Sequence, residues 1–209
     1  MSTPVGQKKV NEKEELPSLS IINESDTDLW DVVVTVTGQK FFCDKKHLAR
    51  HSSFFSSLFL GNMKEAKQGK AVLQKATAEE FKDFLAVIYG ERSPSDDNVE
   101  SLMRLADMWD APHVRNKCED MLVNNSRLEV TRKVEIACKF NREELKTTLI
   151  AQIATFDELR KFSTNQRTPY DHETMTMLFE KSLALESSPP LRPTLEPFYC
   201  RLKSYNGNN

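Results

Sequence analysis

The sequence predicts an α+β fold in which a small mixed sheet is covered by a cluster of helices. Three observations carry this prediction: a β-branched run over residues 32–37, a glycine turn that lets residues 40–43 pair back, and helical apolar stripes downstream. β-Branched side chains favour strands, whereas apolar residues at offsets of three and four favour helices. Strand signals gathered at one end and helices in a following run are typical of the α+β class.

The first element is a hairpin. Residues 32–37 read VVVTVT, which is too apolar and too stiff at χ1 to favour a helix. Gly38 can adopt the positive φ that a tight hairpin connection needs, so residues 40–43 supply a second strand. From Lys45 to Phe59 the apolar residues recur at offsets of three and four, which predicts two short amphipathic helices.

Residues 60–125 add a third strand and three helices. Gly61 suits a left-handed C-cap that ends the preceding helix, and residues 71–73 form the strand. Thr77 and Glu80 have the spacing of a capping box, and Gly90 ends the helix that this box begins. Three apolar stripes mark the helices: Phe81, Phe84, Leu85 and Ile88; Val99, Leu102, Met103, Ala106 and Trp109; Val114, Cys118, Met121 and Leu122.

From Arg127 onward the sequence shows helical patterns and no strand signal. The stripes are Val130, Val134, Ala137 and Cys138; Leu145, Leu149 and Ile153; Met175, Leu178, Phe179 and Leu183. Asn141 with Glu144, and Thr155 with Glu158, mark two further helix starts. We therefore expect an all-α region over residues 126–186.

The two ends of the chain differ from the middle. Residues 1–27 are charged with little periodicity, so we expect a mobile lead-in. Within it, four apolar residues give a weak pattern for a short turn that packs on the domain: Leu16, Leu19, Ile21 and Ile22. Residues 187–209 hold four prolines, which oppose a regular helix and predict an extended, mobile tail.

Composition excludes several classes of function. The chain has 209 residues, 39% hydrophobic and 29% charged, and its net charge of −2 gives no reason to expect a nucleic-acid partner. No stretch reaches the about 20 apolar residues of a membrane span, and no secretory leader is evident. Four scattered cysteines are typical of reduced thiols in a cytoplasmic or nuclear protein, so we do not expect secretion.

No convergent set of reactive groups indicates an enzyme, a metal or a cofactor. His47 and His51 have the i, i+4 spacing that can present two imidazoles to zinc, but no third ligand stands at a motif spacing. Two solvated histidines account for the pair better. His113 and His172 read as surface residues, and no serine lies in a nucleophile-elbow sequence.

The segment from Asp31 to Phe59, DVVVTVTGQKFFCDKKHLARHSSFFSSLF, resembles the BTB/POZ domain. In that family an aspartate opens the first strand, and a Leu-Ala-x-x-Ser-x-x-Phe helix follows the second. The resemblance extends over residues 28–125, and the helices of residues 126–186 are similar to the BACK extension that follows many BTB domains. Asp44 departs from the family, which usually has a histidine there. BTB dimers usually exchange a long first helix and strand, and we expect that helix to be short or missing here.

The resemblance implies a docking surface for another protein. Met63-Lys64-Glu65 resembles the hydrophobic-x-glutamate element by which some BTB domains grip the N-terminal helices of cullin-3. Met offers a flexible apolar contact, and Glu accepts a hydrogen bond that orients the partner. The predicted cullin-docking residues are Phe59, Met63, Glu65, Met108 and Trp109. Two alternatives stay open: Met63 tucks into its own domain, and Trp109, in phase with its stripe, belongs to the core.

A second implied feature is a charged pair near the dimer groove. The hairpin brings Asp31, at the start of the first strand, and Lys45, at the start of the following helix, to one side. If buried, such a pair would fix geometry more than add stability, because desolvation largely cancels the attraction. The alternative is two exposed charges.

Together these features predict a non-enzymatic interaction module that self-associates, docks cullin-3 and presents an unknown substrate protein to a ubiquitin ligase. We find no MATH-like, kelch-like or zinc-finger segment, so substrate recognition is expected from the BACK-like helices, the lead-in, the Phe198-Tyr199 tail or a BTB hetero-partner. One alternative is an oligomerisation scaffold that pairs with larger BTB proteins and binds no cullin. Another is a transcriptional co-regulator whose groove binds a peptide, although the chain lacks a basic localisation block.

Overall fold

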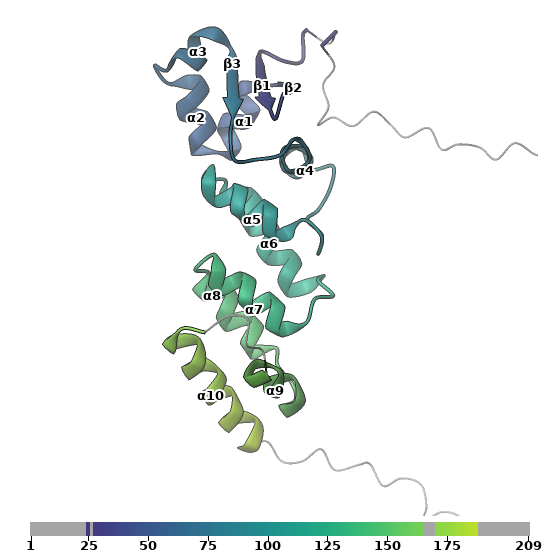
Figure 1. Cartoon of the computed structure of the whole chain (residues 1–209), viewed down its shortest axis with the longest axis vertical. Helices are drawn as coiled ribbons and strands as arrows, with labels where there is room; N and C mark the ends of the chain where they lie inside the picture. The colour runs from purple at the N-terminus through teal and green to yellow at the C-terminus, as the bar shows by residue number, and fades with distance from the viewer. Residues whose placement is uncertain (1–23, 26, 165–169, 188–209) are drawn as a thin grey trace, which may run out of the picture.

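The computed structural model describes residues 24, 25, 27–164 and 170–187. Its elements are stacked along one long axis (Figure 1). The sheet and helices α1 to α3 lie at one end, α4 to α6 follow in the middle, and α7 to α10 form the other end. The predicted α+β class is confirmed.

The sheet has three strands in the order β2-β1-β3. Strands β1 (Val32–Val36) and β2 (Gln39–Cys43) pair antiparallel, and β3 (Lys70–Leu73) pairs parallel to β1. The connection between β1 and β2 places Thr37 and Gly38 at φ values of +45° and +84°. Two consecutive positive φ angles match the twist of a two-residue hairpin, so the predicted turn is confirmed.

One face of the sheet covers the helices and begins the hydrophobic core. Alternate β1 residues, Val32, Val34 and Val36, point to this face and are buried. The core continues through α1 (Lys45–His51), α2 (Ser53–Leu60), α4 (Ala78–Ile88), α5 (Val99–Met108) and α6 (Pro112–Asn124). The inward-facing valines of β1 therefore form the surface on which the apolar stripes of the helices pack.

Side-chain caps start several of these helices. Asp44 accepts hydrogen bonds from the backbone N–H groups of Lys46 and His47, so the residue that departs from the BTB pattern works as the N-cap of α1. The predicted capping box of α4 is confirmed: Glu80 accepts from the Thr77 N–H at 2.8 Å, and Thr77 Oγ1 accepts from the Glu80 N–H at 3.2 Å.

One prediction in this part is wrong. The sequence predicts a left-handed C-cap at Gly61, but the Gly61 backbone is extended at φ −83°. The connection after Gly61, for which the sequence predicts no helix, contains the short helix α3 (Lys64–Gln68). A five-residue helix is too short to show an apolar period, which is why the pattern missed it.

The all-α region predicted after Arg127 contains α7 (Val130–Lys139), α8 (Glu143–Ala151), α9 (Phe156–Thr164) and α10 (His172–Ser187). The start predicted at Thr155 is confirmed, because Glu158 accepts from the Thr155 N–H and Thr155 Oγ1 accepts from the Glu158 N–H. The start predicted at Asn141 is wrong. Asn141 has φ +51° and follows the end of α7, while Arg142 precedes α8.

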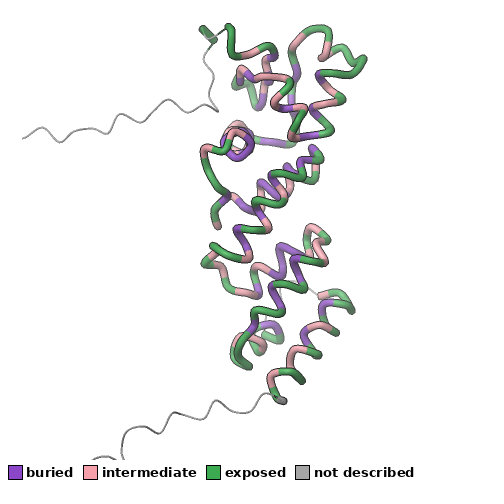
Figure 2. The backbone as a smooth tube through the Cα atoms, turned by 180° about the vertical axis from the view of Figure 1, so that it is seen from behind, coloured by how far each residue is buried: buried purple, intermediate pink, exposed green. Residues whose placement is uncertain are grey.

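The helical extension, residues 126–187, continues the core of the rest of the chain. Buried positions follow one another from the sheet to α8 (Figure 2). Ion pairs join the parts at the surface: Arg142 Nε lies 2.8 Å from Glu119 of α6, and Lys139 Nζ lies 2.7 Å from Glu100 of α5. The extension is therefore packed on the sheet-bearing part rather than tethered to it.

Some predictions concern residues outside those described. These are the lead-in over residues 1–23, the tail over residues 188–209 with Phe198 and Tyr199, and the thiol of Cys200. Cys43, Cys118 and Cys138 are free thiols. Within the described ranges, no helix combines the length and apolar character needed to cross a membrane.

Candidate docking surface

The connection from α2 to β3, residues 61–69, is fixed by a glycine at each end. A Cβ at Gly61 would lie 2.3 Å from the Ser57 carbonyl oxygen, so no other residue fits there without a shift of the backbone. Gly69 adopts the left-handed conformation, φ +62°, and its N–H donates to the Glu65 carbonyl at 2.9 Å. The Gly69 carbonyl accepts from the Val33 N–H, which ties the end of α3 to the sheet.

Met63 and Glu65 lie between these glycines. Met63 occupies the N-cap position of α3 in an extended conformation, and its side chain is 50% exposed. Glu65 is half-buried in the first turn of α3, where a carboxylate interacts favourably with the helix dipole. The alternative in which Met63 tucks into its own domain does not hold, because half of this side chain faces outward.

Two other predicted docking residues are not on the surface. Phe59 is 3% exposed and Trp109 is 2% exposed, so both belong to the core and their assignment to the docking surface is wrong. Met108 is half-buried and packs against the same core. Helical phase had pointed to the core for Trp109, and that alternative is the correct one.

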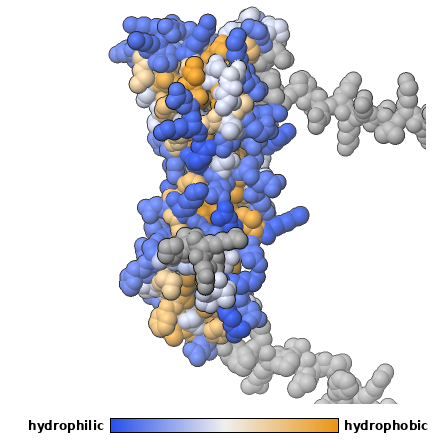
Figure 3. Space-filling view, in the orientation of Figure 1, coloured by the Kyte–Doolittle hydropathy of each residue, from blue (hydrophilic) through white to orange (hydrophobic). Residues whose placement is uncertain are grey.

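An exposed apolar side chain that sequence reasoning did not select lies three residues before Met63 in the chain. Leu60, the last residue of α2, is 54% exposed. We define the docking surface as Leu60, Met63 and Glu65. Figure 3 shows hydrophobic residues among hydrophilic ones at the end of the molecule that holds α2 and α3. An apolar pair with a neighbouring carboxylate is a surface that can bind an apolar ridge and accept one oriented hydrogen bond.

Asp31 and Lys45 form the predicted pair. Lys45 Nζ lies 3.2 Å from Asp31 Oδ2, and the Lys45 N–H donates to Asp31 Oδ1 at 2.7 Å. Their side chains are 41% and 35% exposed, so this is a surface pair that also holds the first residue of α1. Burial, and then the charges of Asp31 and Asp44, raise the pKa of the neighbouring Cys43 to about 12, which keeps it a neutral thiol.

The histidines on α1 are not simply solvated. His47 stacks on Tyr89 at a ring separation of 4.2 Å, and His51 lies 4.8 Å from His47 and 5.0 Å from His113. Burial and then these neighbours lower the pKa of His51, which favours its neutral form. In the part of the chain that the structure describes, no group of three or more His, Cys, Asp or Glu residues is arranged to hold a metal ion.

A second apolar surface lies at the far end, between α9 and α10. It is a groove of about 430 Å³ whose lining includes Phe156, Met175 and Phe179, which are 48%, 53% and 62% exposed. The stripe predicted for α10 is therefore split, since Leu178 is buried whereas Met175, Phe179 and Leu183 face outward. Periodicity finds an apolar stripe but does not tell whether another element covers it.

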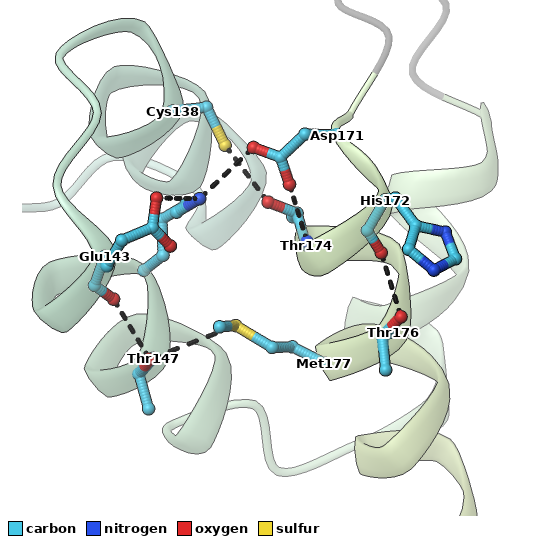
Figure 4. A network of polar contacts seen from close by, with 9 residues as sticks. Cys138, Glu143, Thr147, Asp171, His172, Thr174, Thr176 and Met177 are labelled. Atoms are coloured by element: carbon cyan, nitrogen blue, oxygen red, sulfur yellow. Dashed lines mark hydrogen bonds and ion pairs between the residues drawn. The ribbon is translucent and has the colours of Figure 1, made fainter.

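A buried lysine holds α10 in place. The Lys146 side chain is 1% exposed, and its ammonium group lies 2.7 Å from Glu143 and 3.2 Å from Asp171. Asp171 also accepts from the Thr174 N–H at 2.7 Å, and Thr174 contacts the Cys138 sulfur at 3.6 Å (Figure 4). No sequence pattern indicated this network, because a lysine in a helix usually lies on the solvated face.

Comparisons with known proteins match mainly the sheet-bearing part of the chain. The family model of the BTB/POZ domain matches residues 22–126. BTB and MATH domain-containing protein 15 of Caenorhabditis elegans is 36% identical over 137 residues, which cover 66% of this chain and 50% of that protein. Kelch-like protein 21 of Danio rerio is 31% identical over 108 residues, which cover 51% of this chain and 17% of that protein.

Among solved structures, the BTB domain of human Gigaxonin matches 55% of this chain and 97% of its own, with a TM-score of 0.39 and 15% identity. The chain spans half or less of the length of the curated relatives that it matches.

Proposed function

The chain belongs to the BTB/POZ domain family, a fold for protein interaction, and from that premise we propose that it is a substrate adaptor of a cullin-3 ubiquitin ligase. In this proposal it docks the cullin through Leu60, Met63 and Glu65, associates with itself or other BTB proteins, and catalyses no step. We place it in the cytoplasm or nucleus, where the free thiols of Cys43 and Cys118 would stay reduced.

The observation that carries the proposal is the half-exposed Met63 at the start of α3 with Glu65 in the first turn. This arrangement supports docking because the apolar side chain stands outside the core while the glycines on either side fix its backbone. A residue held in this way can fill a partner's pocket as an anchor, with Glu65 available to orient the partner.

Binding of the purified chain to the N-terminal region of cullin-3, measured by isothermal titration calorimetry, tests the proposal. We expect the variant Met63→Ala/Glu65→Ala to bind at least about thirtyfold more weakly, since the loss of an anchor costs about 2 kcal/mol or more. The unmodified chain must bind for the proposal to stand.

A matched control is available in the same chain. Met175 is 53% exposed, and Glu79 is exposed in the first turn of α4, so Met175→Ala/Glu79→Ala makes the same chemical changes elsewhere. We expect this control to bind cullin-3 as the unmodified chain does. Equal binding by the docking variant would show that residues 61–69 are not the contact.

Substrate recognition is a separate part of the proposal. We propose that the substrate is held by the α9–α10 groove or by a BTB partner with its own reader domain. The groove supports the first route because its exposed aromatic residues, Phe156 and Phe179, are of the kind that anchor protein partners. A Phe179→Asp variant that keeps cullin binding but loses its captured substrate would fit this route.

An oligomerisation scaffold that binds no cullin is the second candidate. The α9–α10 groove also favours this function, because it offers apolar surface at the opposite end of the long axis from α3 (Figure 1). Light scattering separates the two. Self-association that is lost in Phe179→Asp, together with no cullin binding by the unmodified chain, would favour the scaffold.

A further inference from the structure

The outward face of the sheet is unusually apolar. The side chains that point away from the helices are Val33 and Thr35 of β1, Lys40 and Phe42 of β2, and Lys70 and Val72 of β3. They line a hollow of about 510 Å³. When one face of an antiparallel or mixed sheet lies in water, its residues are normally polar. Here three of the six are apolar, and Val72 is 73% exposed.

Trp30 extends this apolar face. Its ring lies against Phe42 with a centroid separation of 4.9 Å, and it lines the same hollow. Its indole Nε1 is buried and has no hydrogen-bond partner among the described residues. A buried donor without an acceptor is unfavourable, so the surroundings of Trp30 are incomplete as described.

Two lysines at the edge of the hollow can pair with carboxylates of a bound segment. Lys40 and Lys70 are exposed at its edge, and neither forms an ion pair with any residue in the described ranges. Glu24 and Glu65 also line the hollow, so the free ammonium groups give it local positive positions rather than a uniform charge.

We propose that residues 12–22 of this same chain, EKEELPSLSII, bind the outward face of the sheet. Leu19, Ile21 and Ile22 supply apolar side chains for Val33, Phe42 and Val72. Glu14 and Glu15 supply carboxylates for Lys40 and Lys70. The acidic and apolar parts of this segment thus match the edge and the floor of the hollow.

The short chain length between residues 12–22 and the hollow also favours this segment over other binding partners. Glu24 lines the hollow, so the chain that precedes it starts at the rim. Ile22 is two residues from Glu24 and Glu14 is ten, and ten extended residues span up to about 33 Å. A segment of the same chain is present at a high local concentration, which a second copy or another protein lacks.

The two tryptophans allow a direct test in the whole 209-residue chain. The sequence has only Trp30 and Trp109, and Trp109 is buried in the core, so quenching of fluorescence by acrylamide reports on Trp30. We expect Leu19→Asp/Ile21→Asp/Ile22→Asp to raise the quenching constant of Trp30 severalfold. A Val5→Asp/Val10→Asp control changes the same lead-in outside residues 12–22 and is expected to have no effect.

A charge exchange tests the pairing without removing apolar contacts. Lys40→Glu/Lys70→Glu is expected to raise quenching of Trp30, and addition of Glu14→Lys/Glu15→Lys is expected to restore it. Circular dichroism confirms that each variant is folded, and a Trp30→Phe variant gives the background from Trp109.

Two results would overturn the proposal. Equal quenching in the unmodified chain and in the triple aspartate variant would show that residues 12–22 do not cover Trp30. Quenching of Trp30 that falls as the protein concentration rises tenfold would show that a second copy of the chain covers the outward face of the sheet. Both measurements are independent of cullin binding, so they do not depend on the proposed adaptor function.

Discussion

In the sheet-bearing part of the chain, Trp109 lies against the rings of Phe55, Phe81 and Phe84, with centroid separations of 4.9 to 5.7 Å. In the helical extension, the start of the last helix is held by the ammonium group of Lys146 between two carboxylates. The first arrangement depends on apolar burial and does not titrate. The second depends on charge, so the two ends of the molecule should respond differently to pH and to substitution.

The largest expected effect is loss of the aromatic cluster. Phe55 is fully buried, so Phe55→Ala should lower the free energy of unfolding by about 3–5 kcal/mol. Its neighbour Phe54 is 37% exposed, and Phe54→Ala should cost far less. Urea unfolding followed by circular dichroism measures both. Similar losses for the two variants would mean that the cluster does not dominate the stability of this part.

A smaller and more local effect is expected at Lys146. Lys146→Ala leaves the carboxylates of Glu143 and Asp171 without their cation, and we expect α10 to open more easily by about 2–3 kcal/mol. The estimate is below that for a fully buried pair because both carboxylates are partly exposed.

Hydrogen exchange of the α10 amides measures this opening, with the α4 and α5 amides as an internal reference. Lys161→Ala is the matched control, because Lys161 pairs with Glu129 at the surface and its loss should leave α10 unchanged. If the α4 amides exchange faster as well, the two regions unfold together and the comparison fails.

The same helix should detach in acid. Hydrogen bonds from Thr174, followed by the interaction with Lys146, lower the pKa of Asp171 from 3.8 to about 2. Because the folded pKa is depressed, this stabilisation is present above the ordinary pKa and is lost as the pH falls from about 4 to about 2. Exchange of the α10 amides should rise over this range, whereas Asp171→Asn should remove this component of the pH dependence.

The smallest effects compare two equivalent caps. Thr77 begins α4 and Thr155 begins α9, each with a glutamate three residues on that accepts from its backbone N–H. Either Thr→Ala change should cost about 1 kcal/mol. We expect Thr77→Ala to lower the global unfolding midpoint and Thr155→Ala to alter exchange only in α9 and α10. Equal global shifts would mean that the extension has no separate stability.

The sequence allowed prediction of features whose causes are local. The hairpin turn at Thr37 and Gly38 and the box at Thr77 follow from backbone preferences and short-range hydrogen bonds. The conformation of Gly61 was not predicted, because this site needs a glycine to avoid a clash with the Ser57 carbonyl rather than to adopt a positive φ. Asn141 was misassigned for the reverse reason, since Asn accepts φ > 0 as readily as it caps a helix.

The candidate site was predicted in part. A motif placed Met63 and Glu65 together, but it also assigned the buried Phe59 to the docking surface, and for Trp109 the correct position in the core was only the alternative. An in-phase apolar residue can be buried, like Trp109, or exposed, like Phe179, and the difference depends on which element lies over it. Lys146 shows the same limit for charge, since its burial follows from the approach of a helix that begins about 25 residues later.

The two glycines that bracket Met63 and Glu65 have a consequence for the thermodynamics of association. Since residues 61–69 are already ordered in the isolated chain, a partner would not have to freeze them on contact, and little affinity would be spent on conformational entropy. A change at Gly61 or Gly69 could therefore weaken a complex without touching the partner at all.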